Sequence, residues 1–150
     1  NPELITGQSA CVIGGGLVGS ELALWLAQKG KDITLIEADS DIIGGPHGTC
    51  FANYQMLKEL LVKHNVDVKL STKLRTITET GIEIEDQESN VSSIDYPHVI
   101  LALGYKAEST IFDQLASQLE VEEVYNIGDS QQARTIMAAI WEGYEIARHI

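Results

Sequence analysis

The chain has 150 residues, of which 44% are hydrophobic, so it is long enough for one domain with a core of its own and too short for two full domains. Its formal net charge of -12 argues against a nucleic-acid partner, because binding to a phosphate backbone requires a basic surface. No apolar run approaches the roughly 18 residues of a membrane helix, so we also expect no membrane partner. The chain starts at Asn1 without an initiating Met or an apolar leader, and we expect an excised piece or processed product without a signal peptide.

The first predicted elements form a βαβ unit around a glycine-rich turn. An apolar strand over residues 10–13 precedes a helix over residues 20–29, and a second strand over residues 33–36 ends at Glu37. The position of Glu37 is close to the roughly 20-residue spacing that is described for a ribose-binding acid. The turn between the first strand and the helix is a G-x-G-x-x-G sequence, and we predict that its residues bind a dinucleotide: Gly14, Gly15, Gly16, Leu17, Val18 and Gly19.

Each part of this unit has a specific role in the predicted site. Gly14 permits the turn out of the strand, Gly16 lets the backbone approach a pyrophosphate, and Gly19 lets the helix pack closely on the sheet. The helix start offers free N–H groups and a partial positive charge to the phosphates. Glu37 can accept hydrogen bonds from both ribose hydroxyls and would repel a 2′-phosphate, so we expect NADH to be preferred over NADPH. A structural glycine turn and a solvent-facing glutamate are the simpler alternatives.

The middle of the chain is predicted to complete the parallel sheet and to add a small antiparallel one. The acidic cluster at residues 85–90 is interpreted as an exposed turn, because it lacks the ligand spacing and central glycine of a calcium loop. Gly104 follows the last buried strand, where it would line the cofactor crevice; a simple turn glycine is an equal alternative. The predicted elements are a loop over 42–48, a helix over 53–64, a strand over 66–70, a β-meander over 74–77, 81–85 and 91–94, and a parallel strand over 98–103.

These patterns predict an α/β fold: a Rossmann-like parallel sheet with helices on both faces and a small antiparallel β-meander as a crossover. A short helix over residues 111–119, a strand over 124–127 and an amphipathic helix over 135–150 follow. An acidic link near residues 120–123 separates a nucleotide-binding domain, residues 1–120, from a C-terminal strand and helix, residues 121–150. We expect the apolar stripe of the last helix to be covered by self-association, giving a homo-oligomer, or to fold back on the sheet.

The two cysteines indicate neither a metal site nor a disulfide framework. Cys11 and Cys50 do not form a C-x-x-C motif, and no other residues suggest a sulfur-rich metal site. Cys11 is predicted to be a small core residue, whereas Cys50 lies in a predicted loop. We therefore expect a cytoplasmic protein with reduced thiols and no metal.

The glycine turn together with the C-terminal residues carries a resemblance to a known family. Over nearly its whole length the chain resembles the NAD(P)-binding region of FAD-dependent pyridine nucleotide-disulfide oxidoreductases. Within that group it is most similar to NADH:flavin oxidoreductases of the old yellow enzyme, 2-enoate reductase and 2,4-dienoyl-CoA reductase type. The C-terminal residues that carry this closer likeness are Gly128-Asp129-Ser130, Arg134, Ala138-Ala139-Ile140, Gly143-Tyr144 and Ala147.

The resemblance implies an NADH-binding domain that positions the nicotinamide for hydride transfer to FAD. It implies that Gly128 and Asp129 contact FAD, that residues 121–150 belong to an incomplete FAD-binding domain, and that Glu21 lies beside the nicotinamide as the candidate catalytic residue. The remainder of the parent flavoenzyme would supply the rest of the FAD domain and an FMN barrel that reduces an activated carbon-carbon double bond. We expect the isolated chain to be inactive. A turn cap for Asp129 and a solvated first-turn acid for Glu21 are the alternatives.

Two other functions remain compatible with the same sequence. In the first, residues 14–19 form an FAD-binding turn instead of an NAD-binding one. In the second, the chain is a non-enzymatic module that uses the fold as a docking or NAD-sensing surface.

Overall fold

The computed structural model describes residues 5–47, 49–118 and 123–150. The chain divides into two compact units, an N-terminal unit (Asn1–Gly104) and a C-terminal unit (Tyr105–Ile150). The domain boundary that the sequence predicts, between residues 120 and 121, lies outside the described residues. None of the helices in the described ranges combines the length and the hydrophobicity of a membrane span.

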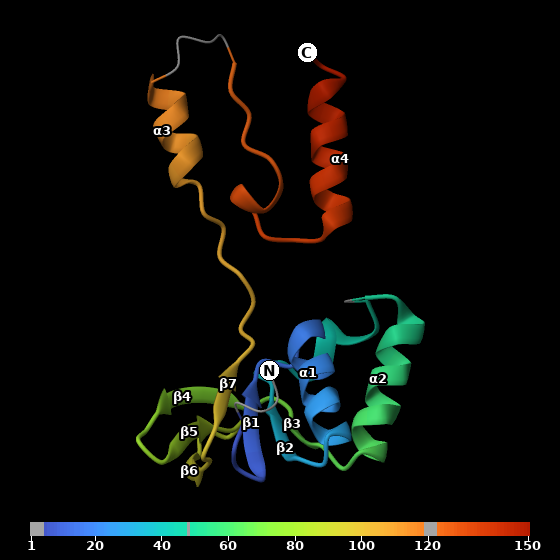
Figure 1. Ribbon diagram of the computed structural model, residues 1–150, viewed down its shortest axis with the longest axis vertical. Helices are drawn as coiled ribbons and strands as arrows, with labels where there is room; N and C mark the ends of the chain where they lie inside the picture. Colours follow the sequence, from blue (N-terminus) through green and yellow to red (C-terminus); the bar gives the residue numbers. More distant parts are fainter. Residues whose placement is uncertain (1–4, 48, 119–122) are drawn as a thin grey trace. The chain divides into compact units, whose positions relative to one another are not determined.

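A four-stranded parallel sheet forms the centre of the N-terminal unit (Figure 1). Its strands are β1 (Ser9–Ile13), β2 (Asp32–Ile36), β3 (Asp67–Lys69) and β7 (Val99–Leu101), in the order β3-β2-β1-β7. In the central strand β1, Cys11 pairs with Thr34 on one side and with Val99 on the other. Residues 10–13 are all buried, as expected for a parallel strand covered on both faces. The predicted βαβ unit is confirmed.

One face of this sheet is covered by two helices, α1 (Leu17–Gln28) and α2 (Phe51–Lys63), which lie side by side (Figure 1). Val12 and Leu35 of the strands form a core with Leu26 of α1 and with Leu57 and Leu61 of α2. The apolar residues of α2 recur at helical spacing, so a single face of that helix is buried. The hydrophobic periodicity of the sequence therefore identified both helices on this face.

The other face of the parallel sheet is covered by a three-stranded antiparallel sheet. Its strands are β4 (Lys73–Ile77), β5 (Gly81–Glu85) and β6 (Val91–Asp95). Ile82 and Ile84 alternate along β5 and pack against Cys11, Ile13 and Ile36 of the parallel sheet. The predicted meander is confirmed, but the expectation of helices on both faces is corrected. In the described part of the N-terminal unit, alternating isoleucines of β5 cover the face on which a helix was expected.

Burial of Cys11 between the two sheets leads to an expected difference in thiol reactivity. Burial raises the pKa of the Cys11 thiol to about 12, whereas Cys50 is exposed, and both cysteines are free. We expect a maleimide near neutral pH to modify Cys50 in the native protein and to leave Cys11 unmodified until denaturant is added. Mass spectrometry of proteolytic peptides measures both sites. Native Cys11 that reacted as fast as Cys50 would contradict the described core.

The described part of the C-terminal unit contains two α-helices, α3 (Thr110–Gln118) and α4 (Ile136–Ala147), and a short 3-10 helix, η3 (Gly128–Ser130). None of the described residues of α3 or α4 is buried. The predicted strand over residues 124–127 is wrong, because neither sheet of the described chain includes this segment and a strand requires a partner. Large apolar side chains of α4 are exposed, namely Ile136, Met137, Ile140, Trp141 and Tyr144. Self-association through this stripe stays a prediction.

Candidate functional site

The glycine turn lies at the carboxyl end of β1, next to the ends of β2 and β7. The N–H of Gly14 donates to the carbonyl of Ile36 at 2.8 Å, which ties the turn to β2. Gly14 has a φ of +104°, and a Cβ at this position would lie 2.4 Å from the carbonyl oxygen of Ala102 after β7. A side chain is therefore excluded at Gly14 both by conformation and by space. The turn occupies the sheet edge at which open α/β folds bind ligands.

The other two glycines of the motif, Gly16 and Gly19, differ in their surroundings. A Cβ on the buried Gly19 would lie 1.8 Å from the carbonyl oxygen of Gly14, so the helix can approach the turn only without a side chain there. A Cβ on the exposed Gly16 would have no described heavy atom within 4 Å. Gly14 and Gly19 are thus required by the packing of the protein itself. Gly16 instead borders open space that atoms of a ligand can fill.

The first turn of α1 offers main-chain donors toward this open space. Gly16 is the N-cap residue, and no side chain within the described part of the chain caps the helix. The first backbone bond of the helix runs from the N–H of Ser20 to the carbonyl of Gly16 at 2.9 Å, so the N–H groups of Leu17, Val18 and Gly19 precede it. The helix dipole adds a partial positive charge at this end. Free amides and a positive dipole end together favour an anion such as a phosphate.

Glu37 lies directly beside the glycine turn. Its Oε2 accepts a hydrogen bond from the N–H of Gly15 at 2.5 Å, and its Oε1 accepts one from the N–H of Asp39 at 2.8 Å. Two main-chain donors thus hold the half-buried carboxylate in one orientation. Each oxygen keeps further acceptor capacity for ligand hydroxyls. The structure therefore brings Glu37 together with the predicted phosphate-binding turn.

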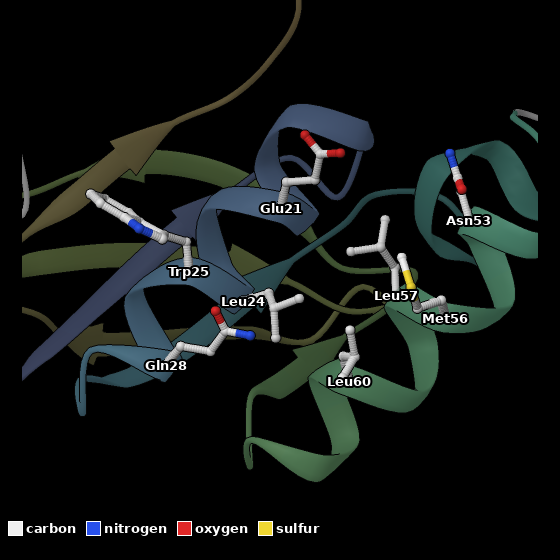
Figure 2. Close-up of a pocket in the computed structure, with 8 residues that line it drawn as sticks. All are labelled: Glu21, Leu24, Trp25, Gln28, Asn53, Met56, Leu57 and Leu60. Atoms are coloured by element: carbon white, nitrogen blue, oxygen red, sulfur yellow. The ribbon is translucent and has the colours of Figure 1, made fainter.

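Glu21 lies on a different feature of the N-terminal unit. It is exposed on α1 and lines a pocket of about 250 Å³ between α1 and α2 (Figure 2). Figure 2 shows Leu24, Leu57 and Met56 along the same pocket, which is mostly apolar at its base. The position of Glu21 beside a nicotinamide stays a prediction. Its side chain is exposed, but the alternative of a first-turn acid is wrong, because α1 begins at Leu17 and has no acidic residue in its first turn.

Gly104 follows β7 by a few residues at the same sheet edge as the glycine turn. It is exposed and has a φ of +83°, and a Cβ there would meet no described heavy atom within 4 Å. Its conformation favours glycine, which agrees with the turn alternative. There is open space around Gly104, and its role as a crevice residue stays a prediction.

Gly128 and Asp129 lie in the C-terminal unit, in the loop before α4. The N–H of Gly128 donates to Oε2 of Glu142 at 2.7 Å, and Oδ1 of Asp129 accepts from the N–H of Arg134 at 3.2 Å. The guanidinium of Arg134 also pairs with Glu142. Asp129 thus caps its own loop, as the structural alternative proposed. Contacts of Gly128 and Asp129 with FAD stay predictions.

Sequence reasoning missed two residues that hold the glycine turn by hydrogen bonds to its main chain. The carbonyl of Gly15 accepts from the hydroxyl of Ser20 at 2.9 Å and from the N–H of Ile43 at 2.7 Å. Ser20 directly follows Gly19, so a small polar residue in the first helical turn was a usable signal. Ile43 reaches Gly15 from a distant loop by its main chain, and nothing in its residue type indicates this contact. Among the described residues, no three potential ligand side chains gather into a metal site.

Comparison with known proteins places these features in one family. The family model for "Pyridine nucleotide-disulphide oxidoreductase" matches residues 2–143. Cinnamate reductase of Clostridium sporogenes is 36% identical over 146 residues, which are 96% of this chain and 21% of that protein. NADH oxidase of Thermoanaerobacter brockii is 29% identical over 145 residues, covering 95% of this chain and 21% of that protein.

A solved structure supports the same assignment. The complex of 2-naphthoyl-CoA reductase with 2-naphthoyl-CoA matches with a TM-score of 0.75 and 26% identity, covering 93% of this chain and 20% of that one. The chain therefore spans about a fifth of the length of these relatives. The resemblance seen in the sequence is confirmed, and the chain belongs to the pyridine nucleotide-disulphide oxidoreductase family.

Proposed function

We propose that the chain is the NADH-binding domain of a flavin-dependent oxidoreductase and that it positions the nicotinamide toward FAD. The observation that carries this proposal is the arrangement at the glycine turn. An uncapped helix N-terminus faces the open space at Gly16, and a fixed carboxylate, Glu37, lies beside the same turn. These are the groups that a pyrophosphate and an adenosine ribose require.

The main-chain amides supply the phosphate-binding part of the site. The N–H groups of Leu17, Val18 and Gly19 would donate to the pyrophosphate, and Gly16 would let it come close to the backbone. The formal charge of the chain is -12, so its overall field opposes an anion. Charges more than about 8 Å away are largely screened at physiological salt, so the nearby amides decide the affinity.

The residues around Glu37 support a preference for NADH. Asp39 and Asp41 follow within four residues, and no Lys or Arg lies between residues 37 and 41. Lys58 is near this segment but is paired with Asp41 at 3.2 Å. A 2′-phosphate would therefore meet several carboxylates. One such repulsion at about 4 Å is worth roughly 1 to 4 kcal/mol near a protein surface, or about tenfold or more in affinity.

Within a flavoenzyme, bound NADH would supply a hydride and FAD would accept it. Glu21 would then lie beside the nicotinamide, Gly104 would line the cofactor crevice, and Gly128 and Asp129 would contact FAD from the C-terminal unit. The names cinnamate reductase and 2-naphthoyl-CoA reductase support a parent enzyme that is a reductase. We propose that it reduces an activated carbon-carbon double bond and has an FMN barrel in the rest of its chain. We place this enzyme in the cytoplasm.

Calorimetric titration of this chain with NADH and NADPH tests the proposal. We expect a Kd for NADH within roughly 1 μM to 1 mM, the range typical of enzyme substrates, and binding of NADPH that is at least about tenfold weaker. A chain that purifies yellow and binds no NADH would support the FAD-binding alternative. To separate the sensor alternative, the missing FAD half is added and NADH oxidation is followed with an artificial acceptor; restored activity excludes a pure sensor.

A further inference from the structure

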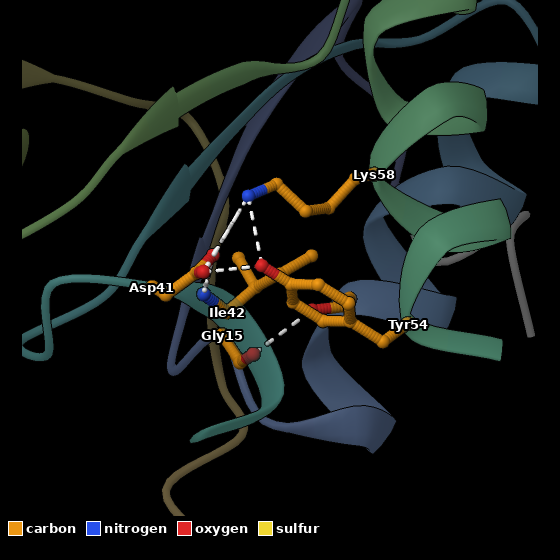
Figure 3. A network of polar contacts seen from close by, with 6 residues as sticks. Gly15, Asp41, Ile42, Tyr54 and Lys58 are labelled. Carbon is orange, nitrogen blue, oxygen red and sulfur yellow. Dashed lines mark hydrogen bonds and ion pairs between the residues drawn. The ribbon is translucent and has the colours of Figure 1, made fainter. Parts of the chain in front are cut away.

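Three polar side chains meet beneath the loop that follows β2. The hydroxyl of Tyr54 on α2 donates to Oδ2 of Asp41, and the ammonium of Lys58 lies 2.9 Å from the Tyr54 hydroxyl and 3.2 Å from Oδ1 of Asp41 (Figure 3). Lys58 lies one helical turn after Tyr54, and its Nζ is 5.0 Å from the centre of the tyrosine ring. The three side chains form one connected network, which we call the Asp41 network.

Hydrogen bonds connect this network to the glycine turn. Oδ1 of Asp41 accepts from the N–H of Ile42 at 2.9 Å, and the next residue, Ile43, donates its N–H to the carbonyl of Gly15 at 2.7 Å. The N–H of the same Gly15 donates to Oε2 of Glu37 at 2.5 Å. A continuous series of contacts therefore runs from Tyr54 through the loop to the carboxylate that would bind the ribose.

The loop needs this support because its backbone is strained. It forms the 3-10 segment η2 (Ile42–His47), in which Ile43 has a φ of +59°. The left-handed region is unfavourable for a β-branched residue and costs of order 1 to 3 kcal/mol. Burial of the Ile43 side chain, which is 6% exposed, and its bond to Gly15 hold this conformation. Loss of the anchor at Asp41 would let the segment relax away from Gly15.

The charges of the network favour a positioning role over a contribution to stability. Hydrogen bonding by the Tyr54 hydroxyl, and then by Lys58 and Ile42, lowers the pKa of the Asp41 carboxyl below its ordinary value. Asp41 is therefore ionised near neutral pH and accepts from all three donors. The Asp41 and Lys58 side chains are 27% and 45% exposed, and partly exposed ion pairs contribute at most about 1 kcal/mol to folding. We therefore expect the network to act mainly by holding the loop at Ile43 in place, and only weakly through the free energy of folding.

We propose that Asp41, Tyr54 and Lys58 are positioning residues that fix Gly15 and Glu37 and thereby set the selectivity of the site for an adenosine ribose without a 2′-phosphate. The proposal rests on the proposed NADH-binding function. The three residues need no contact with the dinucleotide for this role. They act through the loop at Ile43. The N–H of Ile43 donates to the carbonyl of Gly15, and the N–H of Gly15 donates to Glu37.

The test compares two Tyr→Phe variants of the full protein. Tyr54→Phe removes the hydroxyl from the Asp41 network, whereas Tyr96→Phe removes a hydroxyl that donates to Thr34 at 2.8 Å between the two sheets. Tyr54→Phe loses two side-chain hydrogen bonds, to Asp41 and from Lys58, and Tyr96→Phe loses one, so we expect small decreases in Tm for both variants. ADP and 2′-phospho-ADP serve as calorimetric probes, because they share the 5′-diphosphate and differ only by the 2′-phosphate. The selectivity ratio is the Kd of the probe with the 2′-phosphate divided by the Kd of ADP. It reports on the position of Glu37 independently of overall stability.

We expect Tyr54→Phe to weaken ADP binding roughly three- to tenfold, with little change for 2′-phospho-ADP, so that the selectivity ratio falls by the same factor. Tyr96→Phe should keep the ratio of the unmodified protein. Lys58→Met, a substitution of a side chain that is 45% exposed, should lower the ratio in the same direction. Unchanged ratios in both Tyr54→Phe and Lys58→Met would overturn this inference and leave the proposed function standing. Failure of the unmodified protein to bind ADP and NADH would instead overturn the proposed function, and this inference with it.

Discussion

Gly16→Ala is expected to weaken NADH binding about 10- to 100-fold while leaving the stability of the protein within about 0.5 kcal/mol of its original value. The φ of -62° at Gly16 is compatible with alanine, and a Cβ there would have no described heavy atom within 4 Å. The methyl group would instead occupy the space proposed for the pyrophosphate. Calorimetric titration measures the binding, and urea denaturation followed by circular dichroism measures the stability.

Gly19→Ala is the matched control, and its main expected effect is a loss of stability, in contrast to the loss of binding expected for Gly16→Ala. Its Cβ would lie 1.8 Å from the carbonyl oxygen of Gly14 and 3.1 Å from the Cβ of Ala102, and main-chain atoms cannot move away cheaply. Overpacking of this kind destabilises a core by roughly 1 to 3 kcal/mol or more. We therefore expect a clear decrease in Tm for Gly19→Ala. Normal NADH binding by Gly16→Ala would remove the main support for the proposed function.

The contrast between these two glycines also indicates how much the sequence could predict. The G-x-G-x-x-G spacing gave the correct location of the turn, and the packing role assigned to Gly19 agrees with its contact to Gly14. Both follow from local order along the chain, because strand, turn and helix are neighbours in sequence. The hydrophobic periods of 2 and 3.6 residues likewise gave the meander and the helices. The strand-turn-helix order, the helices α1 and α2 and the meander are therefore confirmed.

Features that depend on distant contacts were not available from the sequence. The isoleucines at 82 and 84 predicted a strand, but not that its apolar face would cover β1 and β2 on the side where a helix was expected. Residues 124–127 have the composition of a strand, yet strand formation depends on a partner, and the described sheets include none for them. Local propensity indicates that a segment is able to form a strand, whereas pairing is a tertiary property.

The same limit applies to the candidate site. Asp41 and Tyr54 are separated by thirteen positions and belong to no motif, so their contact became visible only in the structure. Glu37 was identified from its place at the end of a strand. Its bond to the N–H of Gly15 could not be predicted, because the donor is a main-chain group that carries no residue-type signal. Sequence patterns thus indicated candidate ligand-binding groups, whose role stays a prediction, but did not indicate the groups that hold them in place.

Glu37→Ala is expected to weaken NADH binding about 10- to 100-fold and to reduce or abolish the preference over NADPH. The substitution removes the acceptor proposed for the ribose hydroxyls, and the net loss of one hydrogen bond to a charged group, roughly 1.5 to 3 kcal/mol, corresponds to about this factor. It also removes the negative charge that would repel a 2′-phosphate. Parallel titrations with NADH and NADPH measure both effects, and the ratio of the two Kd values is the decisive quantity.

Glu37→Gln separates the binding role of Glu37 from its structural one. In Glu37→Ala the N–H of the buried Gly15 loses its acceptor, which costs roughly 1 to 3 kcal/mol of stability. Glutamine keeps a carbonyl oxygen that can accept from Gly15, so its Tm should stay closer to that of the original protein. Because glutamine has no charge, it should still lose most of the discrimination against NADPH. If Glu37→Gln kept full preference for NADH, the carboxylate would act only as a support for the glycine turn, and the amides of α1 would carry the binding alone.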